Sequence, residues 1–279
     1  GDRLFPLIAI GSTAGAPLGA AMASRLFGLG LSPFLMMELA AVLLAMHLVL
    51  YRVIGARMGS RPGRAAVEPM KAGNGFALVL RSPYLRLVAL LLVALNIVNT
   101  VGEFILAQAV VASADAQQVL DAAFDREAFI GTFYGRYFLL TNLAAIALQA
   151  FVVSRLVKRF GLRGALYALP IVAFCAYGSA SAGAALGDLL YVKVAENSTD
   201  YSVMNTAKQM IWLPTSREEK YKAKQAIDTF FVRAGDMLAA GVVFLGTHIV
   251  HRGVPGFARL NMIFVVIALG LAALVVRGH

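Results

Sequence analysis

Long apolar runs constrain this chain more than any other feature. Of its 279 residues, 59% are hydrophobic and only 14% are charged, which lies outside the usual composition of soluble domains. A run of about 20 apolar residues is long enough to cross the hydrocarbon core of a bilayer as an α-helix. The sequence therefore predicts an all-α, polytopic membrane protein surrounded by a lipid bilayer. The predicted spans lie near 5–26, 33–54, 84–111, 129–153, 164–183, 187–212, 235–251 and 260–277.

The distribution of basic residues supports this set of about eight transmembrane helices. Cytoplasmic segments of membrane proteins carry an excess of Lys and Arg. If the chain starts inside, most of its 25 lysines and arginines fall in the predicted cytoplasmic segments, and the C-terminus is cytoplasmic as well. This pattern explains the net charge of +10 without a nucleic-acid polymer as partner. The predicted cytoplasmic segments are 1–4, 52–86, 154–163, 213–234 and the C-terminus; the opposite side holds only Arg25, Arg126, Arg252 and Arg259.

Residues 55–83 form the long polar connection of the chain, which is basic and contains Gly and Pro. Such a segment is typical of a boundary between two helical units. We therefore predict two helices of an N-terminal transporter half in 1–54, a basic cytoplasmic linker in 55–83 and a six-helix C-terminal half in 84–279. A transporter made of two six-helix halves would show this plan if its first four helices were missing.

Residues 187–212 carry ionisable and amide side chains at predicted membrane depth. Such groups are costly in hydrocarbon and by default mark a pathway or a binding site. At 100° per residue, five of them fall within an arc of about 100° on one helix face, which predicts that they face a shared aqueous cavity. A broken or re-entrant segment is the alternative. The five residues are Lys193, Asn197, Asp200, Tyr201 and Lys208.

Two neighbouring spans add polar residues. Asn96, Asn99 and Glu103 are spaced by three and four, which places them on one helix face. Glu103 either belongs to a network of helix contacts or has a cavity-lining or proton-coupling role. Arg136 either contacts an anion or forms an internal salt bridge with Glu103, and the sequence leaves both readings open.

Residues near the last connection are candidates for a gate. Asp228 and Arg233 lie close to the following span, where alternating access needs contacts that form in one state and break in the other. The four histidines lie far apart without paired ligand spacing, so we predict no metal site and no cofactor. A nucleophile with its base and a phosphate-binding glycine loop are both missing from the sequence, which predicts that the chain is not an enzyme.

The polar segment also resembles the signature of ATP:ADP translocase-type nucleotide transporters of plastids and intracellular bacteria. The resemblance implies a fold related to the major facilitator superfamily, ATP binding, and exchange of nucleoside tri- and diphosphates. It also implies that Lys208 binds substrate and that Glu103 stands at a family acidic position. The motifs that carry it are Asp200-Tyr201-Ser202, Asn205-Thr206-Ala207-Lys208-Gln209-Met210, Leu213-Pro214, Glu218-Glu219-Lys220, Lys222-Ala223-Lys224 and Ala226-Ile227-Asp228.

Together these features predict a secondary transporter of the bacterial inner membrane that exchanges nucleotides or a related phosphorylated anion. Two alternatives stay open: a proton-coupled transporter of another solute, and a non-transporting sensor or anchor for fused soluble regulatory domains. Glu103 and Asp200 are the candidates for charge balance or coupling, and Asp228 and Arg233 for the gate. The predicted substrate-binding residues are Lys208, Lys193, Arg136, Asn197, Tyr201 and Asn99.

Overall fold

The computed structural model describes residues 5–58 and 74–279, and within these ranges the regular structure is entirely helical. Each of the eight predicted spans is helical over most of its length, and the helical structure confirms the all-α fold class. The α-helices are α1 (Phe5–Gly28), α2 (Pro33–Met58), α3 (Gly75–Arg81), α4 (Pro83–Leu120), α5 (Arg126–Leu148), α6 (Ser154–Ser181), α7 (Leu186–Thr199), α8 (Asn205–Met210), α9 (Lys224–Ala226), α10 (Val232–His248) and α11 (Val254–Gly278). Four π-helical turns lie between them: η1 (Gln149–Val153), η2 (Asp200–Met204), η3 (Glu219–Ala223) and η4 (Ile227–Phe231).

By length and composition, five helical stretches of the described residues are able to cross a membrane. One of them, Arg126–Ser181, covers the predicted span 129–153 and nearly all of 164–183, with a kink at Gly161 between them. The polar segment α7–η2–α8 is not among the five, so the number of eight spans stays a prediction. The remaining four stretches are Pro33–Arg57, Pro83–Leu120, Glu219–His248 and Val254–Gly278.

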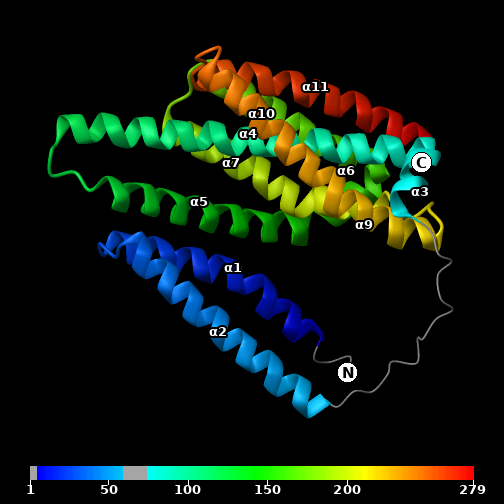
Figure 1. Cartoon of the computed structure of the whole chain (residues 1–279), viewed down its shortest axis with the longest axis horizontal. Helices are drawn as coiled ribbons and strands as arrows, with labels where there is room; N and C mark the ends of the chain where they lie inside the picture. The colour runs from blue at the N-terminus through cyan, green and yellow to red at the C-terminus, as the bar shows by residue number, and fades with distance from the viewer. Residues whose placement is uncertain (1–4, 59–73) are drawn as a thin grey trace.

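Helix α4 lies at the centre of the bundle, with α6, α7, α10 and α11 running alongside it (Figure 1). In the most apolar 18-residue stretch of α4, 61% is buried, against 28% in the corresponding stretch of α11. One apolar cluster surrounds the first half of α4 and includes Leu91, Leu166 and Met204. A second surrounds the other half and includes Ile105 and Phe257. These two clusters hold the helices that carry the polar residues.

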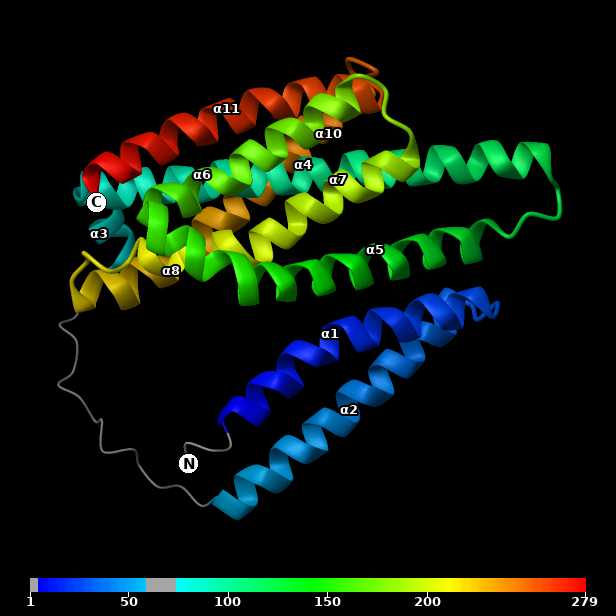
Figure 2. The same ribbon diagram turned by 180° about the vertical axis from the view of Figure 1, so that it is seen from behind.

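Helices α1 and α2 form a hairpin beside the bundle, and α1 runs along α5 (Figures 1 and 2). The close approach depends on two glycines of α5: a Cβ at Gly131 would collide with the ring of Phe27, and one at Gly135 would meet Ser24 at about the same separation. On α1 itself, a Cβ at Gly15 or Gly19 would meet nothing within 4 Å. The small residues that permit this contact are therefore those of α5.

The basic segments gather at one end of the molecule. The end of α2, α3, the start of α4, the turn before α9 and the C-terminus lie at this end, and the turns α1–α2, α4–α5, α6–α7 and α10–α11 lie at the other (Figure 2). The bundle therefore has a basic end and an opposite end, as the charge pattern predicts.

Three connections differ in detail from the prediction. Helix α4 continues to Leu120 instead of ending near 111, and its 38 residues span about 57 Å, more than a bilayer core needs. Residues 154–160 continue the helix, and the chain turns at Gly161, whose φ of 61° suits glycine. Part of the predicted linker, Gly75–Arg81, forms helix α3, and 59–73 lie outside the described residues.

Candidate functional site

The polar residues of the bundle collect in three places, to which we give fixed names. The buried network consists of Glu103, Tyr137, Tyr177, Lys193, Glu196 and Asn197. The inner pocket is lined by polar residues of α4, α7, η2, α8 and η4 together with apolar ones. The lateral hollow lies between α5 and the start of α7, beside the end of α4.

Lys193 is the centre of the buried network and is fully enclosed. Its Nζ lies 2.8 Å from Glu196 Oε2 and 3.5 Å from Glu103 Oε1, so α7 and α4 are joined by an ion pair. Tyr177 on α6 donates its hydroxyl to Glu196 at 2.5 Å. A buried charge is tolerated only when it is paired and hydrogen-bonded, and these contacts meet that condition.

Asn197 extends the network to α5. Its Nδ2 donates to Glu103 Oε1 at 2.8 Å and to the Tyr137 hydroxyl at 2.5 Å, and Tyr137 donates to Glu103 at 3.2 Å. Four helices are therefore linked through side chains that are almost entirely buried, except Glu103, whose side chain is 37% exposed. Of the two interpretations of Glu103, this geometry agrees with a network of helix contacts. Because part of the side chain is exposed, the geometry is also compatible with the cavity-lining interpretation.

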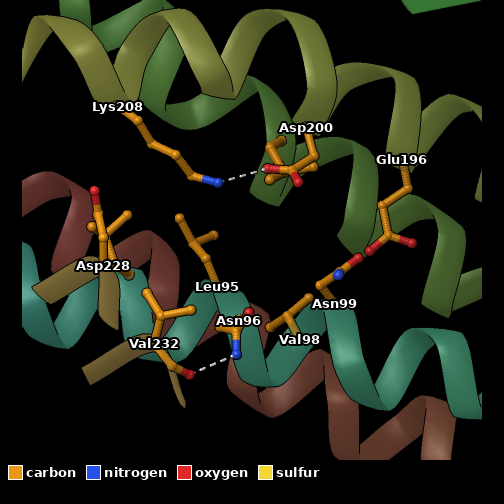
Figure 3. A pocket seen from close by; sticks show the side chains of 11 residues that line it. Leu95, Asn96, Val98, Asn99, Glu196, Asp200, Lys208, Asp228 and Val232 are labelled. Carbon is orange, nitrogen blue, oxygen red and sulfur yellow. Dashed lines mark hydrogen bonds and ion pairs between the residues drawn. The ribbon is translucent and has the colours of Figure 1, made fainter. Parts of the chain in front are cut away.

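The inner pocket has a volume of about 240 Å³ (Figure 3). Lys208 and Asp200 face each other across its upper side, with Lys208 Nζ 3.2 Å from Asp200 Oδ1. Unlike Lys193, both side chains are partly exposed, at 38% and 22%. The remaining polar lining residues are Asn96, Asn99, Glu196 and Asp228.

The π-helical turn η2 explains how Asp200 meets Lys208. Residues eight apart on a regular α-helix are rotated by about 80°. A π-turn accommodates one extra residue, which rotates the following residues back by about 100° and leaves only about 20° between the two. Helical side chains also point toward the N-terminus, so the long Lys208 side chain reaches back to Asp200.

The two predicted gate residues each form an ion pair within their own helix. Asp228 lines the inner pocket and pairs with Lys224, whose Nζ lies 5.9 Å from the centre of the Trp212 ring. Arg233 donates to Asp236 at 3.0 Å. Asp236 also accepts from Asn96 of α4 at 2.6 Å, so it connects α10 to the pocket wall.

Arg136 stands in the lateral hollow, away from the inner pocket. Its Nη2 donates to the Tyr191 hydroxyl at 3.1 Å, and it forms no ion pair with Glu103 or any other described carboxylate. Of the two sequence readings of Arg136, the salt bridge to Glu103 is therefore absent from the described part of the chain.

The structure thus separates residues that helix periodicity had grouped in one cavity. Lys193 and Asn197 lie in the buried network, and Asp200 and Lys208 lie in the inner pocket, because rotation about the axis says nothing about distance along it. Lys193 and Lys208 are 15 residues apart, which is about 22 Å along a helix. Tyr201 is 48% exposed on η2.

Sequence reasoning missed Glu196, Tyr177 and Asp236. Glu196 belongs to both places, since it pairs with Lys193 and also lines the inner pocket. Its spacing of three from Lys193 was a usable signal, because residues at i and i+3 are helical neighbours. Tyr177 and Asp236 find their partners through tertiary packing, which leaves no local signal. Among the described residues, no group of three or more His, Cys, Asp or Glu is placed to hold a metal ion.

The fold and these sites define a polytopic helical membrane protein with a charged interior and a polar pocket. No family model matches the chain, and no solved structure matches it significantly.

Curated relatives do match. The chain is 28% identical over 186 residues to "ADP,ATP carrier protein 1" of Chlamydia trachomatis serovar D, covering 60% of this chain and 33% of the relative. The protein of the same name from Chlamydia muridarum matches equally, and that of Chlamydia pneumoniae is 26% identical over 194 residues, covering 62% of this chain and 36% of the relative. The chain spans about a third of the length of these relatives. The matches support an ATP:ADP translocase-type family. All three relatives are named as carriers and not as enzymes.

Proposed function

We propose that this chain forms part of a secondary transporter that exchanges ATP and ADP, or a related phosphorylated anion, by alternating access. Two findings support this proposal: the similarity to proteins named ADP,ATP carriers, and the lysine that faces a pocket inside a helical membrane bundle. The observation that carries it is the placement of Lys208, the residue that the family resemblance marks for substrate binding, in the wall of that pocket. The fold is proposed to be of the major-facilitator type, in a bacterial inner membrane with the C-terminus in the cytoplasm.

In this proposal the inner pocket holds the phosphate end of the substrate. Its volume of about 240 Å³ is smaller than the roughly 300–1,000 Å³ of sites for whole small molecules, so it accommodates only part of a nucleotide. Lys208 supplies the charge and the Asn99 amide supplies a hydrogen bond. The half-exposed ring of Tyr201 offers a surface for stacking on the base.

Other predicted residues support the inner pocket without lying beside the substrate in this proposal, whereas Arg136 lies outside it, in the lateral hollow. Lys193 and Asn197 are enclosed, so in this proposal they hold Glu103 and Glu196 in place and reach the substrate only through them. Asp200 balances the charge of Lys208 when no anion is present. Asp228 and Arg233 form ion pairs at the pocket rim and on α10 that can break when the bundle changes state.

Exchange in proteoliposomes tests this function. The full-length protein is reconstituted with internal ADP, and uptake of labelled external ATP is measured. We expect ADP-dependent uptake, reduced about tenfold or more in Lys208→Ala because a charge-assisted contact is lost. Lys220→Ala is the matched control, since Lys220 is an exposed lysine outside the pocket.

Three results would contradict the proposal. Uptake driven by a pH gradient and insensitive to nucleotides would favour a proton-coupled transporter of another solute. Absence of any ATP or ADP exchange by folded, reconstituted protein would favour the sensor or anchor for fused regulatory domains. An unchanged rate of ADP-dependent ATP uptake in Lys208→Ala would show that the inner pocket does not bind the exchanged nucleotide.

A further inference from the structure

Arg136 is a cation within a candidate membrane span and has no counter-ion among the described residues. It lies within the candidate span Arg126–Ser181, and 11 residues beyond Asp125, which is about 16 Å along the helix. Its side chain is exposed, and its Nη2 donates a hydrogen bond to the neutral hydroxyl of Tyr191 at 3.1 Å. Ionisable groups within membrane-spanning helices generally pair or mark a binding site. Arg136 therefore lacks the anion that its position favours.

The lateral hollow around Arg136 has the size and walls of a ligand site. Its volume is about 620 Å³, within the roughly 300–1,000 Å³ usual for small-molecule sites. Its walls are largely apolar, with three aromatic rings next to the single guanidinium. The apolar lining residues with large side chains are Phe124, Phe129, Phe133, Leu186 and Leu190.

The acidic residue of the hollow does not neutralise Arg136. Asp125 caps the start of α5, where its Oδ1 accepts a hydrogen bond from the Ala128 backbone at 2.9 Å. The other polar lining residues, Gln117 and Thr132, are uncharged. The charge that Arg136 presents to the hollow is therefore available to a ligand.

The hollow is also separate from the inner pocket. The two share no lining residue among those that the structure describes. Tyr137, next to Arg136 in sequence, points instead into the buried network, and Glu196 of that network lines the inner pocket. Arg136 and Lys208 thus belong to two sites on opposite sides of one buried network.

We propose that the lateral hollow is a second anion site, which binds a phosphate group attached to an apolar portion. Arg136 contacts the phosphate oxygens, and the phenylalanine rings cover the apolar portion. Two ligands share this chemistry: an anionic lipid and a nucleotide. The nucleotide form rests on the proposed function, whereas the lipid form does not.

A tryptophan reporter in the hollow tests this site and separates the two ligands. The full-length protein with Trp212→Phe and Phe129→Trp is placed in nanodiscs, and its emission is read as the difference from the same protein with Phe129 retained. In one arm, brominated phosphatidylglycerol is compared with brominated phosphatidylcholine as a quencher. In the other, ADP is titrated in nanodiscs of unlabelled phosphatidylcholine.

We expect stronger quenching by phosphatidylglycerol if the ligand is a lipid, and a saturable response to ADP if it is a nucleotide. Arg136→Gln should lower the apparent affinity for the ligand about tenfold, because it removes a charge-assisted contact. Arg126→Gln is the matched control, an arginine of the same helix that pairs with Asp115 at 2.7 Å. Lys208→Ala should leave the response unchanged.

Three outcomes would overturn the second site. The first is a response to either ligand that does not depend on Arg136, and the second is no response to either ligand. The third is equal loss in Arg136→Gln and Lys208→Ala, which would show a single shared site. Exchange of ATP for ADP is measured on the same variants reconstituted in proteoliposomes, so failure of the transport function and failure of the hollow are distinguishable.

Discussion

At the scale of single residues, the two lysines of the α7–α8 segment differ in their surroundings. Lys193 is enclosed and contacts two carboxylates, and Lys208 shares a partly solvated pair with Asp200. An exposed ion pair contributes only about 0–1 kcal/mol, whereas breaking a buried one costs about 3–5 kcal/mol. Lys208 can therefore exchange Asp200 for a ligand oxygen, and Lys193 remains with its partners.

Asp200→Asn should raise the affinity for nucleotide. Removing the carboxylate frees Lys208 from an internal competitor, and a pair of this exposure corresponds to about a two- to fivefold change. The measurement is the KM for ADP in exchange, with Asp228→Asn as the comparison at the pocket rim. A loss of affinity as large as that of Lys208→Ala would contradict this reading and show that Asp200 positions the lysine.

Lys193→Met should destabilise the folded protein by about 3–5 kcal/mol, because it leaves Glu196 and Glu103 without their cation. Thermal unfolding in detergent measures the effect. The double variant Lys193→Met with Glu196→Gln should recover part of the loss, since one uncompensated carboxylate is then neutral. An unchanged melting temperature in the single variant would show that the network does not stabilise the fold.

At the scale of helices, α4 must leave room for the network. A Cβ at Gly102 would collide with the Tyr177 hydroxyl and lie 2.9 Å from Lys193 Nζ. We expect Gly102→Ala to destabilise by about 1–3 kcal/mol through overpacking. Gly178→Ala on α6 is the matched control, because a Cβ there meets nothing within 4 Å and alanine favours the helix. Equal melting temperatures for the two variants would contradict the tight packing at Gly102.

At the scale of the whole molecule, the basic end of the bundle predicts its orientation. The single cysteine of the chain, Cys175, is exposed and is first replaced in the variant Cys175→Ser. In this background, Leu213→Cys places a cysteine near the basic end and Leu120→Cys places one at the opposite end, at positions that are both exposed. A membrane-impermeant maleimide applied to intact cells should label Leu120→Cys, and label Leu213→Cys only after permeabilisation, because basic segments stay in the cytoplasm. The reverse labelling pattern would show that the basic end faces the outside and that the predicted topology is wrong.

The sequence alone determined the helical, membrane-spanning character of the protein and the position of each long helix. Apolar runs of bilayer length and the alternation of basic segments are local properties, so they can be read without knowledge of the packing. Ser216 followed by Glu219 three residues later is a capping-box pattern, which is equally local. The structure contains both of its hydrogen bonds: the Glu219 backbone donates to Ser216 Oγ at 3.3 Å, and the Ser216 backbone donates to Glu219 Oε2 at 2.8 Å.

Only the tertiary structure decided which polar groups meet. Asn197 donates to Glu103 across 94 residues of sequence, and Asn96 donates to Asp236 across 140, contacts that depend on which helices are neighbours. The division of Lys193, Lys208 and Arg136 among three places also needed the fold. Periodicity gives the face of a helix, but the position along the axis, the phase shift at η2 and the neighbouring helix determine what that face contacts.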